Sequence, residues 1–183
     1  MKKILTSLAA IACFGMAATA AHATDGVVNF EGMVVDVTCS ISVGNGVGGV
    51  VRLPSIAAHA LQNPDTTAGD TNFSLVLTGC TGGNGKKVVA EFENHMASIN
   101  QDGRLINMME TATDGATGVE LEVLDKVTGD RIILGDPSQL QATNVAIANE
   151  AATLEYVVRY FSPSGSATAG RVSSMLPYTI IYQ

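Results

Sequence analysis

Few residues in this sequence combine the type and spacing that catalysis or metal binding requires. Zinc sites draw histidine and cysteine from short, fixed spacings, whereas His59 and His95 stand apart from each other and from any such cluster. The segment Gly82–Lys87 is similar to a phosphate-binding loop, but the Gly-x4-Gly-Lys-Ser/Thr spacing is not met and no helix is predicted to follow. We expect a glycine-rich turn there, and neither a metal nor a cofactor.

Two pairs of carboxylates have a spacing that could serve a general acid and base. Glu91 with Glu93, and Glu120 with Glu122, lie two positions apart on predicted strands, which puts both members of each pair on one face. We predict that both pairs belong to a solvated outer surface rather than to an acid–base site. Without a convergent nucleophile, acid or base, the sequence indicates a protein that is not an enzyme.

The amino-acid composition narrows the range of protein classes further. The 183 residues are 46% hydrophobic and 15% charged, which suits a globular domain and excludes wholesale disorder. Seventeen acidic side chains against ten basic ones give a formal net charge of −7. A nucleic-acid partner is therefore disfavoured, because neutralising phosphates needs a clustered basic surface.

Residues 1–23 have the layout of a secretory signal peptide. Lys2 and Lys3 precede an apolar run from Ile4 to about Ala18, and Ala21-His22-Ala23 supplies small residues for cleavage. The alternative, a membrane anchor, is disfavoured because the run is short and contains polar residues. We expect a soluble exported protein of 160 residues, starting at Thr24, with a formal net charge of −9.

Cleavage also removes Cys13 and leaves two cysteines. An even pair in an exported chain predicts a disulfide, here between Cys39 and Cys80.

The elements that carry these residues are predicted to be strands. Apolar residues recur at every second position, the period of half-buried strands, and the runs are separated by turn-forming residues. The clearest runs are Phe73-Leu75-Leu77, Val88-Ala90-Phe92, Val119-Leu121-Val123, Leu154-Tyr156-Val158-Tyr160 and Leu176-Tyr178-Ile180-Tyr182. We also predict a hairpin over Val119–Leu134 and one short helix over Ser55–Gln62. This pattern indicates an immunoglobulin-type β-sandwich.

Both ends of the mature chain are predicted to be strands, but a closed sandwich does not readily accommodate either of them. Thr24–Asp36 is strand-like yet precedes the first cysteine, and the strand Ser173–Gln183 stops at the end of the sequence. A sandwich whose last strand coincides with the chain end has either used all its strands or lacks one. If one is missing, another chain must fill the gap by strand addition.

These features together resemble the pilin subunits of chaperone-usher fimbriae, of which the type 1 pilus is a member. The resemblance covers Thr24 to Gln183. It rests on alternating Val28, Phe30, Gly32 and Val34, on the two cysteines 41 positions apart, on Gly118–Asp125 and Val158–Phe161, and on Gly170 followed by Leu176, Tyr178, Ile180 and Tyr182.

The resemblance implies an all-β, incomplete immunoglobulin-like sandwich that lacks its last strand and is completed by a donated one. It implies an N-terminal donor-strand extension over 24–38 and a pilin domain over 39–183. A periplasmic chaperone would lend a strand first, and at the outer-membrane usher the extension of a neighbouring pilin subunit would replace it. The product would be a homopolymeric adhesive fimbria outside the cell, reached through the periplasm.

The resemblance also assigns residues. The donated face would be Gly26, Val28, Phe30, Gly32 and Val34, with Gly26 near the far end of the groove. The acceptor groove and chaperone contact would be Gly170, Leu176, Tyr178, Ile180 and Tyr182.

Within a fibre we expect a major rod subunit, with a minor tip or adaptor pilin as the alternative. The length suits a major rod subunit, whereas an extension of only fifteen residues before Cys39 is closer to minor tip or adaptor pilins. A secreted carbohydrate-binding sandwich is the alternative from another class, although such sites favour clustered aromatics and this chain has no Trp.

Overall fold

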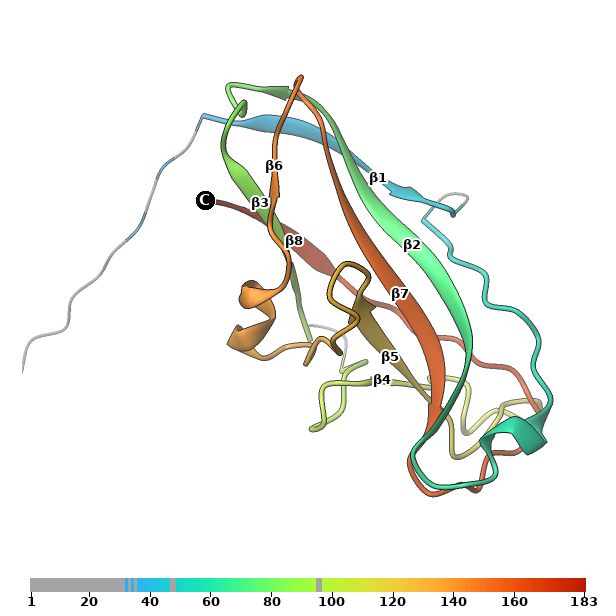
Figure 1. Cartoon of the computed structure of the whole chain (residues 1–183). Coiled ribbons are helices and arrows are strands. Elements are labelled where there is room, and N and C mark those ends of the chain that lie inside the picture. The colour runs from blue at the N-terminus through green and yellow to red at the C-terminus, as the bar shows by residue number, and fades with distance from the viewer. Residues whose placement is uncertain (1–31, 33, 35, 47–48, 95–96) are drawn as a thin grey trace, which may run out of the picture. The chain divides into compact units, whose positions relative to one another are not determined.

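A computed structural model describes residues 32, 34, 36–46, 49–94 and 97–183. The chain divides into two units, Met1–Val34 and Val35–Gln183, and the second contains all the strands of the described residues (Figure 1). The predicted signal peptide and most of the predicted extension lie outside the described residues, so the domain boundaries at residues 23 and 38 stay predictions.

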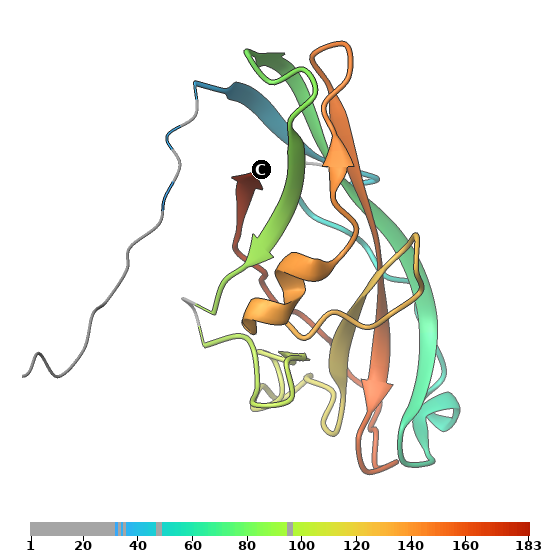
Figure 2. The same cartoon turned by 60° about the vertical axis from the view of Figure 1, so that its left-hand side comes forward.

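The second unit consists of two antiparallel sheets. In the five-stranded sheet the order is β1 (Thr38–Gly44), β2 (Thr66–Thr81), β7 (Ala152–Ser162), β5 (Glu120–Asp125) and β4 (Leu105–Ile106). In the three-stranded sheet the order is β6 (Val145–Ala146), β3 (Lys87–Phe92) and β8 (Tyr178–Tyr182). Figure 2 shows β3 and β8 as one layer beside the layer formed by β2 and β7. The predicted all-β class is confirmed.

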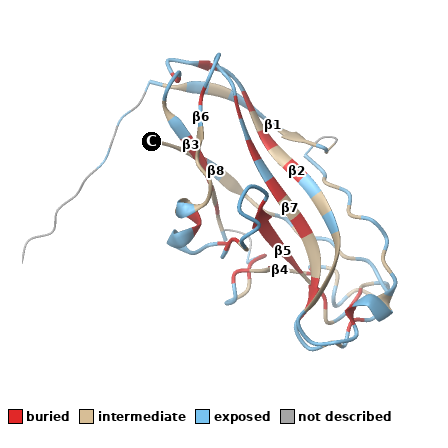
Figure 3. Ribbon diagram, in the orientation of Figure 1, coloured by how far each residue is buried: buried red, intermediate tan, exposed pale blue. Residues whose placement is uncertain are grey.

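The core lies between the layers, where the predicted alternation points. Figure 3 shows buried bands repeating along β2 and β7. Tyr156 lies at the centre, with its ring centroid 5.3 Å from that of Phe73 and 5.3 Å from that of Phe92. Its burial, followed by the Asp125 charge, raises the pKa of the Tyr156 hydroxyl far above its ordinary value. Because successive strand side chains face opposite sides, one dry face per strand is enough to build this core.

Three predicted elements are shorter than expected. The helix is reduced to the 3₁₀ turn η1 (Ala58–Leu61), whose Leu61 is buried. The C-terminal strand begins at Tyr178 rather than Ser173, because the residues before it bond to a loop instead of to a strand. In the hairpin over Val119–Leu134 the return arm makes only an isolated bridge between Leu124 and Arg131.

The turn of that hairpin is organised by Asp125. One carboxylate oxygen accepts hydrogen bonds from the N–H groups of Val127 at 2.8 Å and Thr128 at 3.3 Å, and the other accepts from the N–H of Thr143 at 2.6 Å. Burial alone would raise the pKa of Asp125, but these backbone donors outweigh it and hold the pKa below its usual value. The same carboxylate thereby fixes the turn and the approach to β6.

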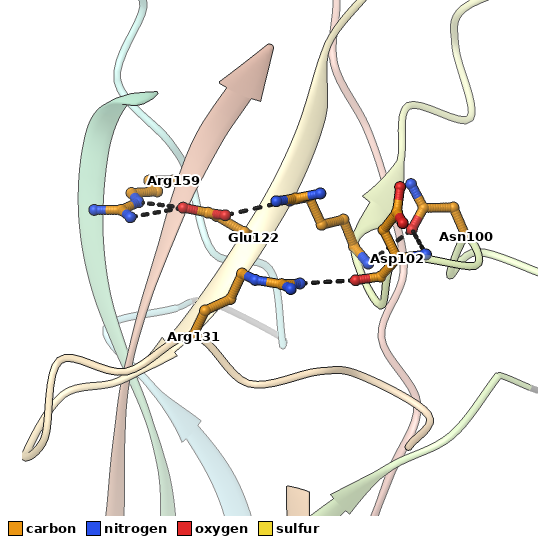
Figure 4. Close-up of polar contacts among 6 residues, drawn as sticks. Asn100, Asp102, Glu122, Arg131 and Arg159 are labelled. Atoms are coloured by element: carbon orange, nitrogen blue, oxygen red, sulfur yellow. Dashed lines mark hydrogen bonds and ion pairs between the residues drawn. The ribbon is translucent and has the colours of Figure 1, made fainter. Parts of the chain in front are cut away.

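The prediction for Glu122 was wrong. Its carboxylate is buried between two arginines: Arg104 Nε lies 3.3 Å from Oε2 and Arg159 Nη2 lies 2.7 Å from Oε1 (Figure 4). The guanidinium of Arg104 also lies 3.7 Å from the centroid of the Phe161 ring. Strand β5 lies between β4 and β7, so long side chains from its flanks cover its outer face. Glu120 is half-buried, and burial raises the pKa of its carboxyl despite the nearby Arg104.

The other carboxylate pair is also less exposed than predicted. Glu91 and Glu93 are half-buried, and Glu93 accepts a hydrogen bond from the hydroxyl of Thr179 on β8.

Candidate functional site

The predicted disulfide is confirmed. Cys39 in β1 is bonded to Cys80 near the end of β2, with their Cα atoms 4.2 Å apart and Cys80 fully buried. The bond closes a loop between residues 41 positions apart, which in the loop-entropy picture stabilises the fold by roughly 4 kcal/mol. It fastens the outermost strand of the larger sheet to its only neighbour among the described strands.

Both sheets end on each side in a strand with one neighbour among the described strands: β1 and β4 in the larger sheet, β6 and β8 in the smaller one. Strands β4 and β6 are two residues long, so β1 and β8 present the longer edges. Strand β1 pairs with β2, and β8 pairs with β3. An unpaired strand edge presents free N–H and C=O groups and accepts a further strand readily. These two edges are therefore the candidate site.

The register of β8 against β3 determines where its backbone groups point. Gln183 and Lys87 exchange two hydrogen bonds, of 3.0 and 2.8 Å, and the N–H of Glu93 donates to the carbonyl of Pro177 at 2.9 Å. Antiparallel strands alternate between hydrogen-bonded and non-bonded pairs. The β8 residues whose N–H and C=O groups point away from β3 are Tyr178, Ile180 and Tyr182.

The same three residues send their side chains toward the core, as the sequence predicted. Ile180 is buried, whereas Tyr178, Tyr182 and the preceding Leu176 are only partly covered. On the β1 side, partly buried hydrophobics continue past the strand. We call the two rows together the apolar edges, and their members are Val43, Val51, Leu53, Val172, Leu176, Tyr178 and Tyr182. All of them pack against one core and keep apolar surface exposed, as a core awaiting one more strand would.

A cavity of about 320 Å³ lies where the two apolar edges meet. Ile56 follows the β1-side edge, Val172 belongs to the β8-side edge, and both line the cavity. Tyr160 of β7 lines it as well. The lining includes a small second hydrophobic cluster built from Leu61, Ala116, Val119 and Ala167. The cavity, which is lined by apolar side chains and by polar groups, thus offers an end point to anything lying along the edges.

Gly170 also lines the cavity, and the structure gives it a physical role. A Cβ on Gly170 would clash with the backbone of Gly115 and Ala116. This close approach is held by hydrogen bonds from the N–H of Ala116 to the carbonyl of Arg171 at 3.0 Å, and from the N–H of Arg171 to the carbonyl of Asp114 at 2.7 Å. Only glycine fits between these two segments without displacing one of them.

Asn107 is a site residue that the sequence analysis missed. Its side chain is buried and donates to the carbonyls of Ala116 at 2.7 Å and Arg171 at 3.0 Å. Its carbonyl oxygen accepts from the N–H groups of Met109 at 3.1 Å and Ser173 at 3.0 Å. A single asparagine in an apolar stretch carries no motif, so its role depends on contacts that only the fold supplies.

The opposite edge of β3 is closed rather than open. Lys87 and Val88 pair with the two residues of β6, and the side chain of Gln139 completes the row. Gln139 belongs to the 3₁₀ helix η2 (Pro137–Gln141). Its amide accepts from the N–H of Phe92 at 2.9 Å and donates to the carbonyl of Phe92 at 3.1 Å, as a neighbouring strand would. Gln139 too was missed by the sequence analysis.

The structure does not bring the predicted donor residues together. Gly26, Val28 and Phe30 lie outside the described residues. Gly32 and Val34 are described as part of the first unit, carry no strand assignment, and Val34 is fully exposed. The donated strand therefore remains a prediction.

Other sequence-based candidates have these outcomes. Gly82 and Gly85 form the predicted turn between β2 and β3, both with positive φ. His59 is exposed, and His95 lies outside the described residues. Within the described part of the chain, no group of three or more His, Cys, Asp or Glu is arranged to hold a metal ion. Across those same residues, no helix has the length and apolarity to cross a membrane.

Comparison with known proteins identifies the family. The model of the family described as FimA, type-1 fimbrial protein A, matches residues 53–183. This chain belongs to the type 1 fimbrial protein family. It is 35% identical to the F17 fimbrial protein of Escherichia coli over 189 residues, covering all of both chains. It is also 35% identical to the major fimbrial subunit SMF-1 of Stenotrophomonas maltophilia over 167 residues, covering 89% of this chain and 95% of that one.

Solved structures agree on the fold of this fimbrial protein. The crystal structure of the P pilus rod subunit PapA has a TM-score of 0.57 at 17% identity, covering 79% of this chain and 99% of that one. The Burkholderia pseudomallei antigen and type I fimbria protein BPSL1626 has a TM-score of 0.55 at 20% identity, covering 79% of this chain and 100% of that one. The predicted immunoglobulin-like pilin fold is confirmed.

Family membership gives the general function. The chain is a structural subunit of a fimbria, a surface-exposed fibre built from such subunits, and its homologues are not enzymes.

Proposed function

We propose that this fimbrial subunit polymerises by donor-strand exchange and forms the rod of its fimbria. The extension 24–38 of one copy would fill the acceptor groove of the next. One observation carries the proposal: two unpaired, apolar strand edges pack against one core and end at one cavity. A strand laid along them would bond to the free backbone groups of β8 and cover the apolar edges.

The predicted donor residues have apolar side chains, which suit the apolar edges. Val28, Phe30 and Val34 alternate along the extension, and fully burying such a side chain stabilises by about 1.5–3 kcal/mol each. Gly32 interrupts the row, which suits a close backbone approach to the acceptor. From the sum of these terms we expect a fibre held by inserted strands to resist mild denaturation.

We further propose that the donated strand runs antiparallel to β8. Every strand pair of both sheets is antiparallel, and an added strand would continue that pattern. Strand β8 leads away from the cavity, so an antiparallel donor runs toward it. This orientation gives the cavity end to Val34 and the opposite end to Gly26.

The route to the surface completes the proposal. The signal peptide 1–23 directs export, a periplasmic chaperone lends its strand to the open edges, and the outer-membrane usher exchanges that strand for the next extension. The chaperone would contact the same backbone groups of β8. Resemblance to chaperone-usher pilins supports these partners.

A gel experiment tests strand exchange. Fibres sheared from expressing cells are compared, boiled and unboiled, for the intact chain and for a chain lacking Thr24–Val35 after the signal. We expect an unboiled ladder that collapses on boiling and is lost with the deletion. A single monomer band in both preparations would overturn strand exchange and leave a soluble binding domain.

The rod assignment needs a separate measurement. The relative SMF-1 is described as a major subunit and the structural neighbour PapA as a rod subunit, which supports the rod role. The short extension favours the alternative, a minor tip or adaptor pilin. Quantitative mass spectrometry of purified fimbriae distinguishes them, because a rod subunit dominates the fibre and an adaptor is present at one or a few copies.

A further inference from the structure

We infer that Asn107 is a positioning residue that keeps the cavity open for the incoming strand. The inference rests on the proposed function, because it concerns how fast the acceptor takes up a donor. It begins with the cavity walls. One wall, residues 170–173, belongs to no named strand, so a ladder of strand hydrogen bonds does not hold it in place.

That wall is held by the loop over residues 107–117. The N–H of Met108 donates to the carbonyl of Ser173 at 2.9 Å, and the N–H of Ala116 donates to the carbonyl of Arg171 at 3.0 Å. Asn107 ties both attachments together, since it bonds to Arg171 and Ser173 on the wall and to Ala116 on the loop. We call this set of contacts the Asn107 clamp.

The wall needs a clamp because none of the described residues fills the space beside it. Protein interiors pack densely, and a wall beside an unfilled volume tends to relax into it. Val172 lies between the two clamped positions and lines the cavity, as does Val119 from the opposite side. Without Asn107, four backbone groups lose a partner and Val172 is free to move into the open volume.

The clamp matters before the donor arrives more than afterwards. A seated strand would fill the cavity and form its own hydrogen bonds to the wall, so the finished complex holds the wall by other means. Preorganisation of this kind mainly lowers the cost of binding. Loss of the clamp is therefore expected to slow association more than it weakens the completed subunit.

Gln139 supplies a matched control. It is also a buried amide that bonds to backbone on both its oxygen and its nitrogen, but its partner is Phe92 on the closed edge of β3. It does not line the cavity. A variant at Gln139 therefore measures how much association slows when a buried amide is lost anywhere in the fold. Any further slowing in a variant at Asn107 is specific to the cavity.

The test uses the full mature chain with its disulfide and a labelled synthetic peptide of residues 24–38 in large excess. Fluorescence anisotropy gives the association rate, and urea denaturation gives the stability of the completed complex. We compare the two variants at urea concentrations at which their completed complexes are equally stable. Under these conditions we expect the peptide to associate with Asn107→Ala at least tenfold more slowly than with Gln139→Ala. Asn107→Asp, which keeps the acceptor oxygen but loses the donor, is the second variant should the alanine variant fail to fold, and it should slow association in the same way.

A peptide carrying Val34→Ala separates positioning from a general structural role. On the wild-type acceptor this peptide should associate several-fold more slowly than the natural peptide, and on the Asn107 variants the two peptides should differ little. Equal slowing in the Asn107 and Gln139 variants, or an unchanged Val34→Ala effect in the Asn107 variants, would overturn the inference alone. Failure of the wild-type chain to take up any peptide would overturn the proposed function and the inference together.

Discussion

The two sides of β3 in the three-stranded sheet differ in whether the outward backbone groups have partners. On one side of β3, the short strand β6 and the amide of Gln139 satisfy the outward backbone groups. On the other side, β8 sends the N–H and C=O groups of Tyr178, Ile180 and Tyr182 away from β3, where no described strand pairs with them. Unprotected edges lead to uncontrolled association. A subunit that must add one strand at one place therefore benefits from closing every edge but the intended one.

The largest effect should come from removing a single donor on the open edge. Ile180→Pro deletes an N–H that points away from β3, so the subunit keeps its bonds to β3 while an incoming strand loses a partner. We expect the unboiled ladder of sheared fibres to disappear. Ile180→Ala, which shortens the side chain but keeps the N–H, is the control and should retain shortened ladders.

Proline at the neighbouring position tests an N–H that points toward β3 instead of away from it. Thr179 pairs with Glu91 in the hydrogen-bonded register, so Thr179→Pro removes a bond inside the sheet. This variant should lower the yield of folded subunit itself. If the two proline variants behaved alike in both folding and assembly, the distinction between the outward and inward groups of β8 would be wrong.

The next largest effect should come from removing the side chain that closes the other edge of β3. Gln139→Leu leaves the buried N–H and C=O of Phe92 without partners, which costs on the order of 2–4 kcal/mol. We expect a lower urea midpoint together with concentration-dependent aggregates, because a second edge becomes available. Gln141→Leu, at an exposed position of the same 3₁₀ helix, is the control. A loss of stability without aggregation would mean that Gln139 supports folding but does not protect the edge.

A smaller loss of stability is expected from a substitution of Gly170, where the two apolar edges meet. Gly170→Ala places a methyl group against the backbone of Gly115 and Ala116, and overpacking of this kind costs about 1–3 kcal/mol. The urea midpoint should fall, and strand uptake should slow because Gly170 lines the cavity. Ala169→Ser, at the exposed neighbouring position that also lines the cavity, should leave the urea midpoint unchanged and is the control for stability alone. A Gly170→Ala chain with normal stability and uptake would show that the two segments have room to separate.

The contrast between the edges also explains what could be predicted from the sequence. Strands such as Phe73-Leu75-Leu77 were predictable because each has one dry face, which imposes a period of two on local sequence. The same reasoning placed Ile180 on the core side of the last strand. The cysteine pair was predictable from its even number once the signal peptide was set aside.

The remaining features depend on residues far apart in the chain. Asn107 and Gln139 are single amides in irregular segments, and their partners lie 64 and 47 positions away. Glu122 was assigned to solvent because its period put it on the outer face, yet Arg104 and Arg159 bury it there. Periodicity reports which face a side chain is on, and it does not report what covers that face.

The smallest effect we predict is a pH dependence of the closed edge. Asp125 accepts the N–H of Thr143, two residues before β6, and the pKa of its carboxyl lies below the usual value. A carboxyl whose pKa is lowered by folding contributes stability above its unfolded pKa of about 3.9, and loses that contribution as the pH falls through the folded value. Stability should therefore be level near neutral pH and decline below about pH 4.

Asp125→Asn isolates this contribution. The asparagine does not titrate, so the difference in urea midpoint between wild type and variant should be largest near pH 7 and shrink as the pH falls below about 4. Hydrogen exchange at Val145 and Ala146 should rise over the same range if the closed edge loosens, while exchange at Ile181, inside the β3–β8 ladder, should change little. A constant difference between the two proteins down to pH 2 would show that Asp125 keeps its proton off throughout, or that its hydrogen bonds contribute nothing to the edge. Equal loosening on both sides of β3 would instead mean that the two edges unfold as one unit, so that the closed edge gains no independent protection from Asp125.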